Sequence, residues 1–180
     1  MKVLIDTNIA LTYLSGREDT YAKEARDIMM MCAKEEIDGA LAFHSLSIIW
    51  YHTRYMPDEI RRDWIRQLCD VLTITGADNE AILEAISDVY FEDFEDAMQD
   101  RCAVSFNANY IVTANIKDFK DHSIIPALTP TELLEKVAEN QKSVSSDSVL
   151  DYWYGYESQS CFHCGVWAFQ GCPSVQFEGG

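Results

Sequence analysis

The sequence predicts a three-layer α/β/α sandwich built on a short parallel sheet, followed by a tail. Four short apolar runs alternate with longer segments in which apolar residues recur every three to four positions. The short runs have the character of buried strands, and the longer segments that of amphipathic helices. Strands that alternate with helices form parallel βαβ units, whose helices cover the sheet. The 180 residues therefore fit one domain of Rossmann-like topology with an appendage.

The predicted strands are short and apolar. They cover residues 2–5, 40–43, 71–75 and 110–113. The first ends at Asp6, and the fourth runs directly into a cluster of polar residues. Buried strands of a parallel sheet typically have this near-continuous apolar character.

Helices are predicted between and after these strands. They cover residues 8–16, 20–36, 45–55, 58–69, 79–89, 93–106 and 129–140. Gly16 is expected to end the first helix, and the third must end before Pro57. Thr129 and Glu132 have the spacing of a capping box, which predicts the start of the last helix.

A change of composition divides the chain near residue 140. Residues 1–139 carry the alternating pattern of strands and helices and are predicted to form the domain. Residues 140–180 start with a Ser-rich linker, and the last thirty residues hold five of the eight glycines and no Lys or Arg. We expect this tail, rich in Cys and aromatic residues, to become ordered on a partner or on a neighbouring subunit. Zinc binding by Cys161, Cys164 and Cys172 stays an open alternative, because a structural zinc site needs four well-placed ligands.

The composition limits the classes of partner. The net charge of −16 argues against a broad electrostatic grip on nucleic acid, which depends on Lys and Arg, although a local basic patch is compatible with it. No apolar run approaches the ~20 residues of a membrane helix, so no membrane association is expected. Asp6 interrupts the amino-terminal run before the core of a signal peptide is complete, so we expect a cytoplasmic protein.

Polar residues gather where the first and fourth strands end. Asp6 follows the first strand directly, and Asn115 and Asp118 lie just beyond the fourth. Open α/β sheets bind their ligands outside the carboxyl ends of the strands. We therefore expect these three side chains to belong to one site.

A run of acids in the predicted helix at 93–106 is a second source of charge. Asp93, Asp96 and Asp100 are three and four residues apart and are expected to share a helix face. A bound cation would relieve their repulsion, and carboxylate oxygens suit Mg²⁺ or Mn²⁺. An exposed acidic helix start, favoured by the helix dipole, is the alternative.

Three segments together resemble a PIN domain, and more narrowly the VapC-type toxin ribonucleases of toxin–antitoxin pairs. Asp-Thr-Asn at 6–8 resembles the opening motif of that family, and Glu-Asp-Ala at 95–97 resembles its central motif. Val-Thr-Ala-Asn at 112–115, followed by Lys-Asp-Phe, resembles its last motif. Each motif is weak alone, but three in order at predicted strand or helix ends form a fairly specific signal. The resemblance covers residues 1 to about 139.

The resemblance implies metal-dependent hydrolysis of RNA with Mg²⁺ or Mn²⁺, a cognate antitoxin as partner and a homodimer. The metal ligands it implies are Asp6, Asp96 and Asp118, with Asn115 as a further catalytic residue. It also implies a set of substrate-binding residues, which consists of Thr7, Asn8, Thr113 and Lys117. Asn8 has capping of the next helix as an alternative role.

The sequence departs from this family at one position. Relatives usually have a second acid at the start of the helix after the second strand, which falls here within Ser47, Ile48 and Ile49. Asn115, often Asp in relatives, removes another charge. The alternative function is therefore a catalytically weakened PIN-like module that binds RNA or protein without cleaving it.

Two further residue sets have simpler interpretations. Four basic residues lie close together, namely Arg54, Arg61, Arg62 and Arg66. They could contact RNA phosphates or an acidic partner, but pairing with nearby acids of the same helix is favoured. Three isolated cysteines are expected to be buried free thiols, namely Cys32, Cys69 and Cys102.

Overall fold

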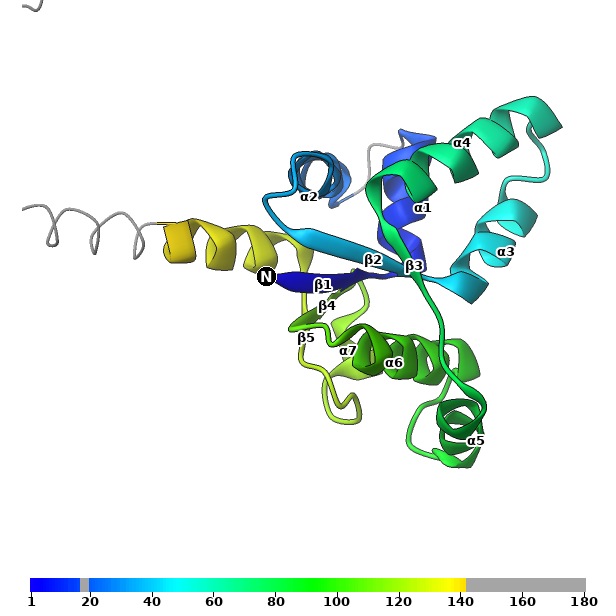
Figure 1. The fold of residues 1–180 in the computed structure, drawn as a ribbon, viewed down its shortest axis with the longest axis vertical. Coiled ribbons are helices and arrows are strands. Elements are labelled where there is room, and N and C mark those ends of the chain that lie inside the picture. Colours follow the sequence, from blue (N-terminus) through cyan, green and yellow to red (C-terminus); the bar gives the residue numbers. More distant parts are fainter. Residues whose placement is uncertain (17–19, 142–180) are drawn as a thin grey trace, which may run out of the picture. The chain divides into compact units, whose positions relative to one another are not determined.

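Five parallel strands form one sheet in the order β3-β2-β1-β4-β5 (Figure 1). The computed structural model describes residues 1–16 and 20–141, so the predictions for the tail lie outside the described residues. The strands are β1 (Lys2–Ile5), β2 (Asp38–Ala42), β3 (Thr73–Thr75), β4 (Tyr110–Val112) and β5 (Ala127–Leu128). From β1 the chain adds β2 and then β3 on one side, and it then adds β4 and β5 on the other side of β1. The sheet therefore has its topological switch point between β1 and β4.

The helices cover both faces of this sheet. They are α1 (Thr7–Ser15), α2 (Ala22–Ala33), α3 (Phe43–His52), α4 (Asp58–Val71), α5 (Asn79–Ser87), α6 (Phe94–Phe106), the single turn α7 (Ile116–Phe119) and a last helix over residues 130–141. Figure 1 shows α1, α2 and α4 on one face and α5 and α6 on the other. The predicted three-layer arrangement is confirmed.

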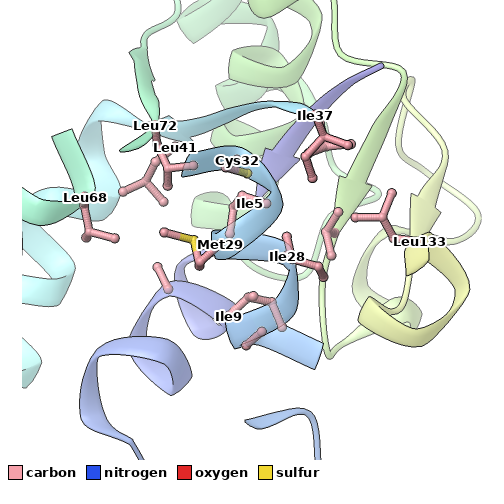
Figure 2. Close-up of a cluster of buried hydrophobic side chains, with 14 of the residues drawn as sticks. Ile5, Ile9, Ile28, Met29, Cys32, Ile37, Leu41, Leu68, Leu72 and Leu133 are labelled. Atoms are coloured by element: carbon pink, nitrogen blue, oxygen red, sulfur yellow. The ribbon is translucent and has the colours of Figure 1, made fainter. Parts of the chain in front are cut away.

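The alternation of side chains along β1 divides the core into two clusters. Val3 and Ile5 point to the face covered by α2, whereas Leu4 belongs to the cluster under α6. Figure 2 shows the first cluster, in which Ile28 and Met29 of α2 are almost completely buried near Ile5. Burial of each such side chain stabilises the fold by about 1.5–3 kcal/mol, so both layers are anchored on the central strand.

Among the described residues, the buried thiols of Cys32 and Cys102 belong to different layers. Cys32 of α2 lies in the first cluster and Cys102 of α6 in the second. The prediction of a buried thiol was wrong for Cys69, which is exposed on α4. Its helix is amphipathic, and the buried position of its last turns is taken by Leu68.

Helix and strand boundaries differ from the predictions by a few residues. The second helix ends at Ala33 because Glu35 adopts a positive φ of 59°, which stops helical hydrogen bonding. The third helix starts earlier than predicted, at Phe43. The short elements β5 and α7 were not predicted, since two and four residues are too few for a periodic signal.

The predicted capping box at the start of the last helix is confirmed. The backbone N–H of Glu132 donates to Thr129 Oγ1 at 3.2 Å, and the backbone N–H of Thr129 donates to Glu132 Oε2 at 2.8 Å. Across the described ranges, every helix is too short or too polar to cross a membrane.

Gly39 of β2 lies unusually close to α2 and to the residue that follows α4. A Cβ atom at this position would lie 2.5 Å from Cys32 Sγ and 2.8 Å from Leu72 Cδ2. Gly39→Ala should therefore force the packed layer apart and cost about 1–3 kcal/mol. The expected result in a thermal unfolding experiment is a melting temperature lower by roughly 2–10 °C.

Gly76 is the matched control, because nothing lies within 4 Å of the Cβ that Gly76→Ala would add. That variant should melt at or slightly above the parent temperature. Equal melting temperatures for the two variants would contradict the close packing at Gly39.

Candidate functional site

Asp6 lies at the switch point of the sheet and is almost completely buried. Asp6 directly follows β1, and its backbone N–H donates to the carbonyl of Val112 in β4 at 3.0 Å. Its extended backbone lets its side chain turn back and cap α1, accepting from the backbone N–H of Asn8 at 3.4 Å. The strand end and the helix start are therefore joined through one carboxylate.

Two side chains from other elements complete the contacts of Asp6. Thr113 Oγ1 donates to Asp6 Oδ2 at 2.7 Å, and Gln99 Nε2 of α6 donates to Asp6 Oδ1 at 3.0 Å. The Thr113 hydroxyl also accepts from the backbone N–H of Asn115 at 2.9 Å. A buried carboxylate needs such donors, so α1, α6 and the end of β4 are all fixed around it.

The carboxyl ends of β1 and β4 open into a cleft of about 520 Å³. Its acidic side chains are Asp6, Asp93, Glu95, Asp96 and Asp118. They come from the end of β1, from the start of α6 and from α7. An adjoining cleft shares three of these acids and is also lined by Lys117.

Two acids of the cleft, Asp96 and Glu95, have a raised pKa. Burial is the main reason that the pKa of Asp96 is raised to about 7. The negative charges that add to this effect belong to Asp6, Asp118, Asp93 and Glu95. Burial also raises the pKa of Glu95. The cleft is thus a place where a cation would be strongly favoured.

The carboxylates are close enough to repel, but they are not gathered at one point. In the described ranges, no three His, Cys, Asp or Glu side chains are placed to hold a metal ion as they stand. Gln99 and Thr113 already donate hydrogen bonds to Asp6, and the Thr7 hydroxyl donates to Glu95. Metal binding at this cleft would therefore require these side chains to rotate toward the ion.

Comparison with known proteins places the chain in a family. A sequence profile described as PIN domain matches residues 2–117. The chain belongs to the PIN-domain family. Among curated proteins, none matches it.

Two solved structures share the fold of this PIN domain. VapBC2 from Rickettsia felis, bound to a DNA fragment from their promoter, superposes with a TM-score of 0.56 at 18% identity, covering 72% of this chain and 98% of the other. VapBC-1 from nontypeable Haemophilus influenzae superposes with a TM-score of 0.55 at 16% identity, covering 73% of this chain and 99% of the other. At these identities the likeness concerns the fold.

The PIN fold brings most of the predicted site residues together. The first cleft is lined by six of them, namely Asp6, Thr7, Asn8, Asp96, Asn115 and Asp118. Thr113 lies buried behind Asp6, and Lys117 lines the adjoining cleft. Their catalytic, substrate-binding and metal-binding roles stay predictions.

Asp100 does not belong to this site, although its spacing from Asp96 suggested a shared face. It is completely buried and pairs with Arg101 at 3.2 Å. Its other oxygen accepts from the Ser123 hydroxyl and from the backbone N–H groups of Ile124 and Ile125. Asp100 therefore holds the loop before β5 and does not line the cleft with Asp96.

Sequence reasoning missed Glu95 and Gln99 as cleft residues. Glu95 Oε1 accepts from Thr7 Oγ1 at 3.1 Å, and that hydroxyl also lies 2.8 Å from Ser45 Oγ of α3. Gln99 is buried one turn after Asp96. Helical spacing was the available signal, since Gln99 lies three residues after Asp96 and four after Glu95 and is therefore a neighbour of both on the helix surface.

Two arginines of the basic cluster pair with acids of their own helix. Arg61 is buried, pairs with Asp58 at 2.7 Å, donates to the Trp50 carbonyl at 2.7 Å and lies 3.5 Å from the Trp50 ring centroid. Arg66 pairs with Asp63 at 2.8 Å. The favoured interpretation of internal pairing is confirmed for these two arginines.

The contact between Thr113 and Asp6 yields a stability prediction. Thr113→Val keeps the side-chain shape but removes the hydroxyl donor, which leaves a buried carboxylate oxygen without it. The expected loss is about 1–3 kcal/mol. Thermal unfolding at neutral pH should show a melting temperature lower by roughly 2–10 °C. Thr113→Ser keeps the donor and should lose much less; an equal loss for both variants would contradict the proposed importance of this hydrogen bond.

The raised pKa of Asp96 yields a prediction about pH. The folded protein binds the Asp96 proton more tightly than the unfolded chain, so ionised Asp96 destabilises the fold, fully above pH 7 and not at all below about pH 4. Without metal, Asp96→Asn should therefore raise the melting temperature most at pH 8, and this gain should shrink as the pH falls toward 4. Asp70→Asn, on the exposed face of α4 outside the cleft, controls for the change in net charge. A gain that does not depend on pH would show that Asp96 is not under this strain.

Proposed function

We propose that this PIN domain is a divalent-metal-dependent endoribonuclease and the toxin of a toxin–antitoxin pair. The observation that carries the proposal is the convergence of Asp6, Asp96 and Asp118 on one cleft at the switch point of the sheet. These are the residues that match the three family motifs. The raised pKa of Asp96 supports the same assignment, because perturbed carboxylates in a cleft are typical of functional sites.

The donors in the cleft fit a hard divalent cation. The cleft offers carboxylate, amide and hydroxyl oxygens, which Mg²⁺ and Mn²⁺ prefer. Gln99 Oε1 is buried, and none of the described residues donates a hydrogen bond to it. Asp6, Asp96 and Asp118 would hold the ion. When bound, such an ion lowers the pKa of a water molecule and stabilises charge on the attacking and leaving oxygens of a phosphodiester.

The other residues of the site have roles in positioning and binding. Thr113 and Gln99 orient the Asp6 carboxylate, and the Asn115 amide lines the same cleft. Lys117, in the adjoining cleft, is suited to attract an RNA phosphate toward the acids. Thr7 and Asn8 line the cleft along α1 and are proposed to contact the substrate.

The proposal of an antitoxin partner rests on likeness. The two solved structures compared with this chain are VapBC complexes, and the three motifs resemble the toxin component of toxin–antitoxin pairs. RNA as substrate and a homodimer are proposed from the same resemblance.

A second candidate function is a PIN module that binds RNA or protein without cleaving it. Ile48 favours this alternative, because it lines the cleft from α3 with an aliphatic side chain. An acid at that position is what the family usually supplies. The two functions differ in whether metal binding is followed by cleavage.

The test combines calorimetry with an RNA cleavage assay. The full chain should bind Mn²⁺ and cleave single-stranded RNA in its presence, and Asp6→Asn combined with Asp96→Asn should abolish both. If the double variant binds Mn²⁺ as tightly as the parent, the acids do not form the site. If the parent binds Mn²⁺ but leaves a broad RNA pool intact, the second function is the correct one.

A further inference from the structure

The cleft wall formed by α3 lacks an acid, but a carboxylate from another helix lies next to it. Ser45 and Ile48 are one helical turn apart on α3 and lie on the same helix face. The Ser45 hydroxyl lies 2.8 Å from Thr7 Oγ1, and that oxygen lies 3.1 Å from Glu95 Oε1. Glu95 of α6 is thus brought through Thr7 to the side of the cleft on which Ile48 lies.

An independent observation on α6 points to a ligand in the same cleft. Gln99 follows Glu95 by one helical turn, is 1% exposed and lines the same cleft. Its Nε2 is used by Asp6, but its Oε1 receives no hydrogen bond from any described residue. A buried acceptor without a partner is destabilising, so a bound group that satisfies it is favoured.

We propose that Glu95 supplies, from α6, the carboxylate ligand that α3 lacks, and that Gln99 Oε1 is the neutral oxygen beside it. This inference rests on the proposed metal-dependent function. It assigns the missing charge to a residue one position before Asp96, so one helix start provides two ligands. The total negative charge of the site is thereby kept without an acid on α3.

A structural role for Glu95 makes a different prediction. An acid in the first turn of a helix is stabilised by the helix dipole, and the Thr7 contact alone would explain its position. In that case its charge would matter for folding and not for metal binding. Glu95→Gln separates the two roles, because the amide keeps an acceptor for Thr7 while the charge is lost.

The experiment is a calorimetric titration of the full chain with Mn²⁺. Glu95→Gln should weaken the Kd for Mn²⁺ by at least about tenfold, since affinity follows the number of charged ligands. Its matched control is Glu92→Gln. Glu92 is exposed and lines the adjoining cleft, but it does not line the first cleft, which contains Asp6 and Glu95. The control should bind Mn²⁺ within about twofold of the parent, because its charge lies outside the proposed ligand set.

A rescue tests whether Glu95 replaces the α3 acid. Ile48→Glu, placed in the Glu95→Gln background, returns a carboxylate to the same wall and should restore most of the Mn²⁺ affinity. Ile48→Gln in that background is the uncharged control and should restore less. Melting temperatures measured with and without Mn²⁺ provide a second readout, since a charge near an apolar wall is tolerated only when a cation pairs with it.

The outcomes separate this inference from the function beneath it. If the parent binds Mn²⁺ and both Glu95→Gln and Glu92→Gln bind it with the same affinity, the role of Glu95 is overturned and the metal-dependent function stands. A loss in Glu95→Gln that Ile48→Glu does not restore overturns the replacement of the α3 acid. A parent that binds no Mn²⁺ overturns both proposals.

Discussion

The burial of one carboxylate, that of Asp6, constrains the rest of this site. A charged group removed from water is tolerated only where donors replace its hydration. The donors here come from the first turn of α1, from α6 and from the residue that follows β4. Each of these elements must hold its position for Asp6 to be satisfied. At the switch point of the sheet, α1, α6 and the end of β4 are therefore held together through their hydrogen bonds to Asp6.

Burial of these acids also makes negative charge in the cleft destabilising to the fold. Further carboxylates stand around Asp6, and burial together with their mutual repulsion keeps a proton on Asp96 up to a pH of about 7. A fold selected only for stability would place apolar or neutral groups there. The proposed cation in the cleft would relieve this repulsion.

Much of the architecture could be predicted from the sequence, because the alternation of strands and helices determines which residues meet at the switch point. Asp6 and Asp118 were expected there from the strand ends alone. The helix positions were harder to interpret. Glu95, Asp96 and Asp100 are all acids at the start or middle of α6. Glu95 and Asp96 line the cleft, where Glu95 also accepts from Thr7 of α1, whereas Asp100 is sealed under the loop at 123–125. Helical spacing gives a relative direction, whereas the partner on each side depends on loops that carry no periodic pattern. Gln99 was missed for a related reason, since an amide in a helix is usually on the surface.

The placement of Cys32 and Cys102 in opposite layers gives the fold a built-in set of chemical reporters. Burial raises the pKa of the Cys32 thiol to about 12 and that of Cys102 to about 11, so neither has appreciable thiolate while its layer is closed. Cys69 is exposed on α4 and is open to alkylation throughout. The rate at which each buried thiol becomes reactive measures how often its own layer lifts from the sheet. The opening of α2 on one face and of α6 on the other can thus be followed separately in the unmodified chain.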